Sequence, residues 1–295
     1  MSVTYDDIVS AQQEQGDVIR KTSLTFSDTF TQLTGSTVYL KNEFEQKTGS
    51  FKLRGAYYKI KTLSEEERKN GVVAASAGNH AQGVAYASAL EKINCTIVMP
   101  KNASPAKVAA TRGYGATVVL EGKNYDESWI KAQEIAKTTG ATIIHAFDDS
   151  QIIAAQGVIG LEIIEQLPDV DEIYVPIGGG GLAAGILVAI KDKNPNVKVI
   201  GVESKSFPSM KKSLDSGKVE TIEGGFTVAD GISVRTPGEQ TFEIIKDKID
   251  EIVLVDDNEI INTMFLLMER SKSVVEPAGA AGLAYLVSKK PSPGK

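Results

Sequence analysis

Short runs of β-branched and apolar residues alternate with helical patterns along nearly the whole chain. Several of these runs are apolar at consecutive positions, which is typical of parallel strands that are covered on both faces. Helical patterns lie between them, for example residues 150–166, which end before Pro168, and residues 258–270. The eight runs that predict strands are residues 38–44, 71–76, 95–99, 116–120, 142–145, 172–177, 197–203 and 251–255. This alternation predicts an α/β protein with mostly parallel sheets.

The length of the chain favours two domains. Eight or more strands with their helices exceed what a single sheet comfortably holds in 295 residues. A capping box formed by Ser64 and Glu67 predicts the start of a short helix between two of the strands.

Composition excludes several classes of protein. Acidic residues outnumber basic ones by 38 to 32, and no long basic block is present, so the sequence predicts no nucleic-acid partner. Cys95 is the single cysteine, which favours a reducing compartment. The first residues are acidic and lack the apolar run of a secretion signal, and no apolar stretch is long enough for a membrane span. We therefore expect a cytoplasmic protein that acts on a small molecule.

The first candidate motif is SFKLRGA at residues 50–56, which follows a predicted strand and opens a predicted helix. The preceding turn and cap residues place Lys52 in the first helical turn. A cation at that position opposes the helix dipole, so the placement is slightly unfavourable unless the amine has a use. A solvated surface lysine is the simpler interpretation from position alone.

The second motif is SAGNHAQG at residues 76–83, again a strand end that leads into a helix. Free backbone N–H groups at a helix start, together with a tight turn at Gly78, can bind an anion such as a carboxylate. The side chain of Asn79 can donate and accept hydrogen bonds beside it. An ordinary turn capped by Ser76 is an equally good interpretation, and His80 is either a base or a polar cap.

The third motif is VPIGGGGLAAG at residues 175–185. Four glycines between an apolar strand and an apolar helix disfavour folding, since each costs about 0.5–1 kcal/mol relative to alanine. They are explained if backbone N–H groups must surround a phosphate at the start of the helix. A flexible linker is the alternative, although linkers seldom join two buried elements.

The same glycines fit a rival interpretation. Residues 179–184 satisfy the G-x-G-x-x-A fingerprint of dinucleotide-binding proteins, and Glu203 lies about twenty residues further on, where a ribose-binding acid is expected. A nicotinamide-dependent dehydrogenase is therefore an alternative, but it leaves the first two motifs unexplained. His80, His145 and Cys95 lack the spacing of metal ligands, so the sequence predicts no metal.

Taken in this order, the three motifs resemble those of the fold type II pyridoxal-phosphate enzymes, in the branch of L-threonine/L-serine dehydratases and serine racemases. The resemblance continues through ADG at residues 229–231 and EPAGA at 276–280, so it covers almost the whole chain. It implies a two-domain fold like that of the tryptophan synthase β-chain, with the active site between the domains. Residues 1–64 and 148–295 would form a large cofactor-binding domain, and residues 65–147 a small substrate-binding domain.

The resemblance also implies roles for individual residues with pyridoxal 5'-phosphate as the cofactor. Lys52 would hold the cofactor as a Schiff base and remove the α-proton of the substrate. Phe51 would lie beside the cofactor ring, and Asn79 would contact its 3'-oxygen. The phosphate would be bound by the backbone N–H groups of Gly178, Gly179, Gly180, Gly181 and Leu182. The substrate carboxylate would be bound by the turn of Ser76, Ala77, Gly78, Asn79 and His80.

The activity implied by the resemblance is that of an L-threonine dehydratase, a lyase that makes 2-oxobutanoate and ammonia and also converts L-serine to pyruvate. Such enzymes serve amino-acid degradation or isoleucine biosynthesis, and a homodimer or homotetramer is expected. A serine dehydratase or racemase is the alternative within the family, and an inactive binding protein is the alternative without catalysis. Ala77 stands where serine racemases have a second acid–base serine, which favours dehydration. Ser209 stands where an acid of their metal site after Glu203 is expected, which argues against a metal.

The end of the sequence also departs from the family. Residues 276–287 predict a cap and a helix, after which the family has a further strand that ends in S-G-G-N. A serine or cysteine at that place in the family binds the pyridine nitrogen. This sequence ends with the polar residues 291–295, so we expect the large domain to lack its last strand.

Overall fold

The strands of the computed structural model, which describes residues 3–289, form three sheets. In the first, β1 (Leu24–Phe26) pairs antiparallel with β2 (Tyr39–Lys41). The second is parallel with the order β5-β4-β3-β6, made of β3 (Val72–Ala75), β4 (Cys95–Met99), β5 (Thr117–Leu120) and β6 (Thr142–Ile143). The third is parallel with the order β7-β8-β9, made of β7 (Glu172–Pro176), β8 (Lys198–Ser204) and β9 (Glu251–Val255). The prediction of an α/β fold with mostly parallel sheets is confirmed.

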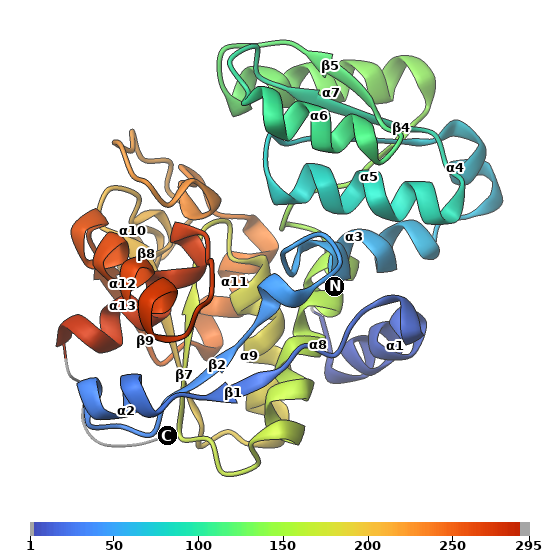
Figure 1. The fold of residues 1–295 in the computed structure, drawn as a ribbon. Helices are drawn as coiled ribbons and strands as arrows, with labels where there is room; N and C mark the ends of the chain where they lie inside the picture. The colour runs from blue at the N-terminus through green and yellow to red at the C-terminus, as the bar shows by residue number, and fades with distance from the viewer. Residues whose placement is uncertain (1–2, 290–295) are drawn as a thin grey trace.

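Helices connect and cover these strands (Figure 1). The helices before and around the second sheet are α1 (Tyr5–Gln15), α2 (Asp28–Thr34), α3 (Lys52–Lys61), α4 (Glu65–Asn70), α5 (Asn79–Glu91), α6 (Pro105–Gly113) and α7 (Tyr125–Thr139). Those around the third sheet are α8 (Ser150–Gln166), α9 (Gly181–Lys193), α10 (Ser209–Ser216), α11 (Glu239–Lys248), α12 (Asp257–Arg270) and α13 (Pro277–Lys289). Short 3₁₀ turns are η1 (Gly16–Val18), η2 (Glu43–Glu45) and η3 (Asp230–Ile232). None of the helices within residues 3–289 has the length and apolar character needed to cross a membrane.

The central strands of both parallel sheets are buried on two faces, which explains their continuous apolar runs, whereas the edge strand β5 is partly exposed. In β3, Val72 and Ala74 join an apolar cluster with α3 and α5, whereas Val73 and Ala75 face α7. The third sheet is covered by α8, α9 and α11 on one face and by α12 and α13 on the other. Side chains of successive residues point to opposite faces of a strand, so a strand covered on both faces is apolar at most consecutive positions.

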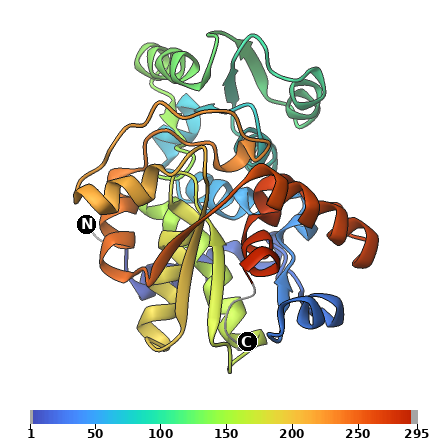
Figure 2. The same cartoon turned by 90° about the vertical axis from the view of Figure 1, so that its left-hand side faces the viewer.

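Helix α3 lies between the two parallel sheets (Figure 2). Its residues Leu53, Ala56 and Ile60 are buried in one apolar cluster with residues of β3, α5 and the start of α8. The first residue of α3 is Lys52, so the packing of this helix against α5 and α8 fixes the position of the lysine.

Several predicted elements differ from the structure in extent. The strand predicted over residues 38–44 ends at Lys41, because Glu43 and Glu45 turn into η2, where the carboxylate of Glu45 accepts hydrogen bonds from Ser23. The strand predicted over residues 142–145 covers only Thr142–Ile143, and β1 was not predicted, since two of its three residues are exposed. Helix α8 and the Ser64–Glu67 capping box agree with their predictions. The polar turn predicted after residue 287 begins too early, because α13 continues to Lys289, and residues 290–295 lie outside the described residues.

Candidate active site

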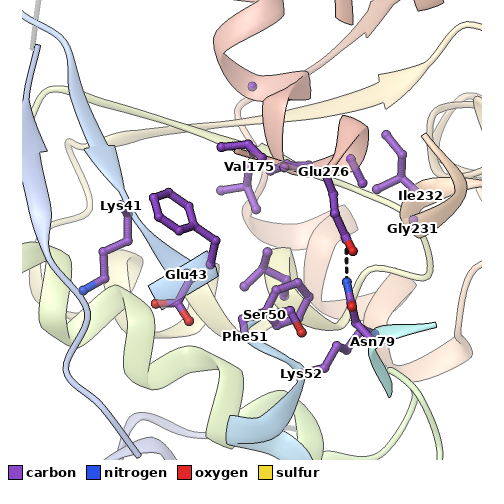
Figure 3. A pocket seen from close by; sticks show the side chains of 18 of the residues that line it. Lys41, Glu43, Ser50, Phe51, Lys52, Asn79, Val175, Gly231, Ile232 and Glu276 are labelled. Carbon is purple, nitrogen blue, oxygen red and sulfur yellow. Dashed lines mark hydrogen bonds between the residues drawn. The ribbon is translucent and has the colours of Figure 1, made fainter. Parts of the chain in front are cut away.

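A cavity of about 890 Å³ lies where the three sequence motifs meet. The carboxyl ends of the parallel strands point to this region, which is where α/β proteins commonly hold ligands. Its lining includes Lys52 from the first motif, Glu276 from the start of α13, and η3 (Figure 3). It also includes residues 76–80 of the second motif and residues 178–182 of the third. The structure therefore brings every predicted site residue to one cavity.

Lys52 is half-buried and extends toward a turn on the far side of the cavity. Its Nζ donates a hydrogen bond to the carbonyl oxygen of Ala146 at 2.7 Å and lies 5.3 Å from the centre of the Phe51 ring. Burial removes water from the amine and lowers the pKa of Lys52 to about 8. At pH 7 roughly a tenth of such amines are neutral, compared with about one in 2,500 for a free lysine.

The turn before α5 is held firmly against the second sheet. Ser76 donates its backbone N–H to Val98 in β4, and its hydroxyl accepts the N–H of Gly78 at 3.1 Å. The first N–H groups of α5 have no partner within the helix, and the residues that carry them line the cavity. The side chain of Asn79 donates a hydrogen bond to Glu276 at 2.6 Å, which joins α5 to the start of α13 (Figure 3). This turn can bind an anion at the positive end of α5.

The side chain of His80 makes a hydrogen bond in the core and acts neither as a helix cap nor as a base. Its Nε2 lies 2.9 Å from the carbonyl oxygen of Ile144, and since a carbonyl only accepts, this nitrogen carries the proton. The side chain is buried, and burial lowers the pKa of His80 to about 3, with the charge of Lys52 acting in the same direction. The imidazole therefore stays neutral, so His80 can bind an anion in the cavity only with its backbone N–H group.

The glycine loop, residues 178–181, forms a cradle whose neighbours leave no room for side chains at Gly179 and Gly180. Helix α9 begins at Gly181, and Gly180 adopts a left-handed conformation with φ of +96°. A Cβ atom at Gly179 would collide with the ring of Phe147, and one at Gly180 would lie 2.8 Å from Thr241. Because only glycine fits, backbone N–H groups at the start of α9 can come close to a ligand in the cavity. The hydroxyl of Ser50, at the cavity wall, is buried without a hydrogen-bond partner.

Glu203 lies near the end of β8, as the dehydrogenase interpretation expects, but its side chain does not line the cavity. Its fully buried carboxylate accepts the N–H groups of Met210 and Lys211 at 2.8 and 2.9 Å, so it caps the start of α10. Burial raises the pKa of Glu203 to about 7, although these two N–H donors act in the opposite direction. The hydroxyl of Ser209 donates to the carbonyl of Val234. Within residues 3–289, no group of three acidic, histidine or cysteine side chains has a geometry that could hold a metal.

Two elements that support the site were not singled out from the sequence, a turn at the cavity wall and a threonine behind the glycine loop. The turn of residues 146–148 accepts Lys52 through Ala146 and places the Phe147 ring against the glycine loop. Its position directly after a predicted parallel strand was a usable signal, because such strands end at the same edge as Ser76. Thr241 supports the glycine loop from α11, and no feature of the sequence around it indicates this contact.

Comparisons with known proteins agree with one another. The family model described as "Pyridoxal-phosphate dependent enzyme" matches residues 16–295. A protein of Thermotoga maritima named L-threonine ammonia-lyase is 52% identical over 293 residues, which cover 99% of this chain and 73% of that protein. The structure of maize serine racemase has a TM-score of 0.96 and 34% identity, covering 99% of this chain and 89% of the other. Threonine deaminase isoform 2 from Solanum lycopersicum, in its processed form, has a TM-score of 0.92 and 36% identity, covering 98% and 87%.

Proposed function

The chain belongs to the pyridoxal-phosphate dependent enzymes, and on that basis we propose that it is an L-threonine ammonia-lyase, which converts L-threonine to 2-oxobutanoate and ammonia. The observation that carries this proposal is the convergence in one cavity of a lysine with a lowered pKa and two helix N-termini, those of α5 and α9. An amino acid needs an anion site for its carboxylate, and the cofactor needs another for its phosphate. The dehydrogenase alternative is wrong, since the family match is to pyridoxal-phosphate enzymes and Glu203 is a helix cap.

The residues around the cavity fit pyridoxal phosphate. The glycine cradle excludes side chains but leaves backbone donors at the start of α9, as a phosphate requires. Lys52 would hold the cofactor, Phe51 would lie beside its ring and Asn79 would contact its 3'-oxygen. The phosphate would be held by Gly178, Gly179, Gly180, Gly181 and Leu182. When bound, the cofactor supplies an electron sink that stabilises negative charge on the α-carbon of the substrate.

The protein's own part in the reaction is binding, orientation and proton transfer. The turn of residues 76–80 would bind the substrate carboxylate with its backbone N–H groups, which fixes the α-carbon near Lys52. The amine of Lys52, whose pKa is about 8, can accept the α-proton near neutral pH. Loss of the β-hydroxyl as water then gives an enamine, and this product takes up water after release to form 2-oxobutanoate and ammonia.

Ala77 favours dehydration over racemisation. Its methyl group lines the cavity beside the predicted carboxylate site and cannot carry a proton. Racemisation needs a proton donor on each side of the substrate, so we expect a lyase although maize serine racemase has a similar fold. L-serine, which differs from L-threonine by one methyl group, should also be accepted and give pyruvate.

The two parallel sheets support a division of the chain by function. Residues 65–147 contain the complete second sheet, and we propose that they form the substrate-binding domain. Residues 1–64 and 148–295 would form the cofactor-binding domain. A homodimer or homotetramer in the cytoplasm, serving threonine degradation or isoleucine biosynthesis, completes the proposal.

The test measures 2-oxobutanoate from L-threonine with the pyridoxal-phosphate-loaded protein. Lys52→Ala should abolish turnover while the circular dichroism spectrum is unchanged, and Lys101→Ala, which removes an exposed lysine, should retain turnover. Borohydride fixes the cofactor to the lysine that holds it, and mass spectrometry should find it on Lys52. Cofactor fixed to another lysine, or turnover by Lys52→Ala, would contradict the proposal.

A further inference from the structure

Thr241 contacts the glycine loop from the side opposite the cavity. Its hydroxyl donates a hydrogen bond of 2.6 Å to the carbonyl oxygen of Gly179, and the backbone N–H of Gly238 approaches the same oxygen at 3.3 Å. The side chain of Thr241 is fully buried in α11, which packs beside α9 (Figure 1). Gly179 lines the cavity and Thr241 does not. The hydroxyl therefore holds the back of the loop.

This contact fixes which way the next N–H group points. In a planar trans peptide, the carbonyl of one residue and the N–H of the next point in opposite directions. With the Gly179 carbonyl directed at Thr241, the N–H of Gly180 is directed away from α11, toward the side on which the cavity lies. Gly180 has a φ of +96°, a conformation that a glycine leaves easily unless neighbouring contacts hold it.

Asp148 holds Thr241 itself in place. Its carboxylate accepts the backbone N–H groups of Glu239, Gln240 and Thr241 at 2.9–3.2 Å, which caps the start of α11. Asp148 directly follows Phe147, whose ring lies against Gly179, and Ala146, whose carbonyl accepts Lys52. One short turn thus connects the lysine, the glycine loop and the helix that carries Thr241.

We propose that Thr241 is a positioning residue for cofactor binding, which turns the Gly179–Gly180 peptide so that its N–H group faces the cofactor phosphate. The inference rests on the proposed assignment of the glycine loop to the phosphate. Loss of the hydroxyl frees this peptide to rotate and leaves the buried Gly179 carbonyl with only the long contact from Gly238. Loss of the hydroxyl should weaken contacts to the phosphate but not contacts to the pyridine ring, which Lys52 and Phe51 would hold.

The experiment compares the affinity of the apoprotein for pyridoxal 5'-phosphate and for pyridoxal, which lacks the phosphate, by equilibrium dialysis. Thr241→Val removes the hydroxyl at nearly constant volume and should weaken pyridoxal-phosphate binding about tenfold or more, with little change for pyridoxal. Thr241→Ser keeps the hydroxyl and should bind both ligands as the parent does. Thr263→Val is the matched control, because Thr263 is also buried and donates to a backbone carbonyl, but within α12.

Phosphorus NMR of the bound cofactor gives a second readout, which should change in Thr241→Val and not in the control. If Thr241→Val does not fold, Thr241→Ala makes the same comparison without adding bulk. Equal loss of affinity for both ligands, or no loss, would overturn the proposal while leaving the lyase function intact. A parent protein that binds pyridoxal as tightly as pyridoxal phosphate would instead refute the assignment of the glycine loop, and the positioning role with it.

Discussion

Four charged side chains form a largely buried ion cluster around Arg54, which follows Lys52 by two residues in α3. Arg54 donates to Glu162 at 2.6 Å and to Glu43 at 2.8 Å, and Lys41 donates to Glu162 at 2.6 Å. The Arg54 side chain has no exposed surface, and that of Glu162 is 5% exposed. Burial acts to lower the pKa of Arg54, but the two carboxylates raise it above its ordinary value. With two positive and two negative charges, the cluster is balanced.

Arg54→Met should destabilise the protein strongly. The change leaves two carboxylates with Lys41 as the remaining cation of the cluster, and removing one partner of a buried ion pair costs about 3–5 kcal/mol. Urea unfolding followed by circular dichroism measures the loss in free energy of unfolding. Lys131→Met is the control, since it removes an exposed pair with Glu134 that contributes about 0–1 kcal/mol.

The direction in which a second substitution changes the free energy of unfolding tests the electrostatic reasoning. Adding Glu43→Gln to Arg54→Met removes the excess negative charge, so the double variant should be more stable than Arg54→Met alone. Arg54→Lys should lose part of the stability, because an ammonium cannot form the two-pronged contacts of a guanidinium with both carboxylates. A loss from Arg54→Met no larger than that of the control would refute the reasoning.

Three further predictions concern the site. Gly180→Val should weaken pyridoxal-phosphate binding about tenfold or more, since its φ is +96° and a Cβ would meet Thr241; unchanged affinity in equilibrium dialysis of a folded variant would refute the cradle. Only the neutral amine attacks the cofactor, so its attachment to the apoprotein, followed by absorbance, should speed up as pH rises through about 8 and then level off. A midpoint near 10.5, the ordinary value for lysine, would contradict the lowered pKa of Lys52. L-serine should give pyruvate, and chiral chromatography should find no D-serine. Ala77→Ser should raise the amount of D-serine. Abundant D-serine from the parent protein would exclude the one-sided proton transfer.

The fold was predicted from patterns among residues that are close together in the sequence. The bounds of α8 were predicted to the residue, because Asp149 caps its start and Pro168 follows its end. β1 escaped prediction, since a three-residue strand with two exposed positions has no apolar run. The strand predicted over residues 38–44 was too long, because contacts of Glu43 with Arg54 and of Glu45 with Ser23 pull the chain into a turn.

For the site, the motifs indicated which residues meet but not how each is held. The two glycine-containing turns follow β3 and β7, and the carboxyl ends of parallel strands are where such sites are expected. Lys52 follows β2 of the antiparallel sheet, so its approach to the two turns depends on the packing of α3. The state of His80 depends on burial and on the carbonyl of Ile144, which is 64 residues away. The hydrogen bond from Thr241 to Gly179 spans 62 residues. Contacts between residues so far apart depend on how α5 and α11 pack in the fold, which no local pattern encodes.

The arrangement of helix ends explains how one amine can serve as both a free base and a proton carrier. Helices α3, α5 and α9 all begin at the cavity, and each places a partial positive charge there. Partial positive charge disfavours a protonated amine, and burial lowers the pKa of Lys52 to about 8, so the amine is readily neutral when it meets the cofactor. In the proposed function, a phosphate at α9 and a carboxylate at α5 would bring negative charge close to Lys52 and raise the affinity of its amine for a proton. Binding of the two anions would therefore help Lys52 to keep the α-proton that we propose it removes.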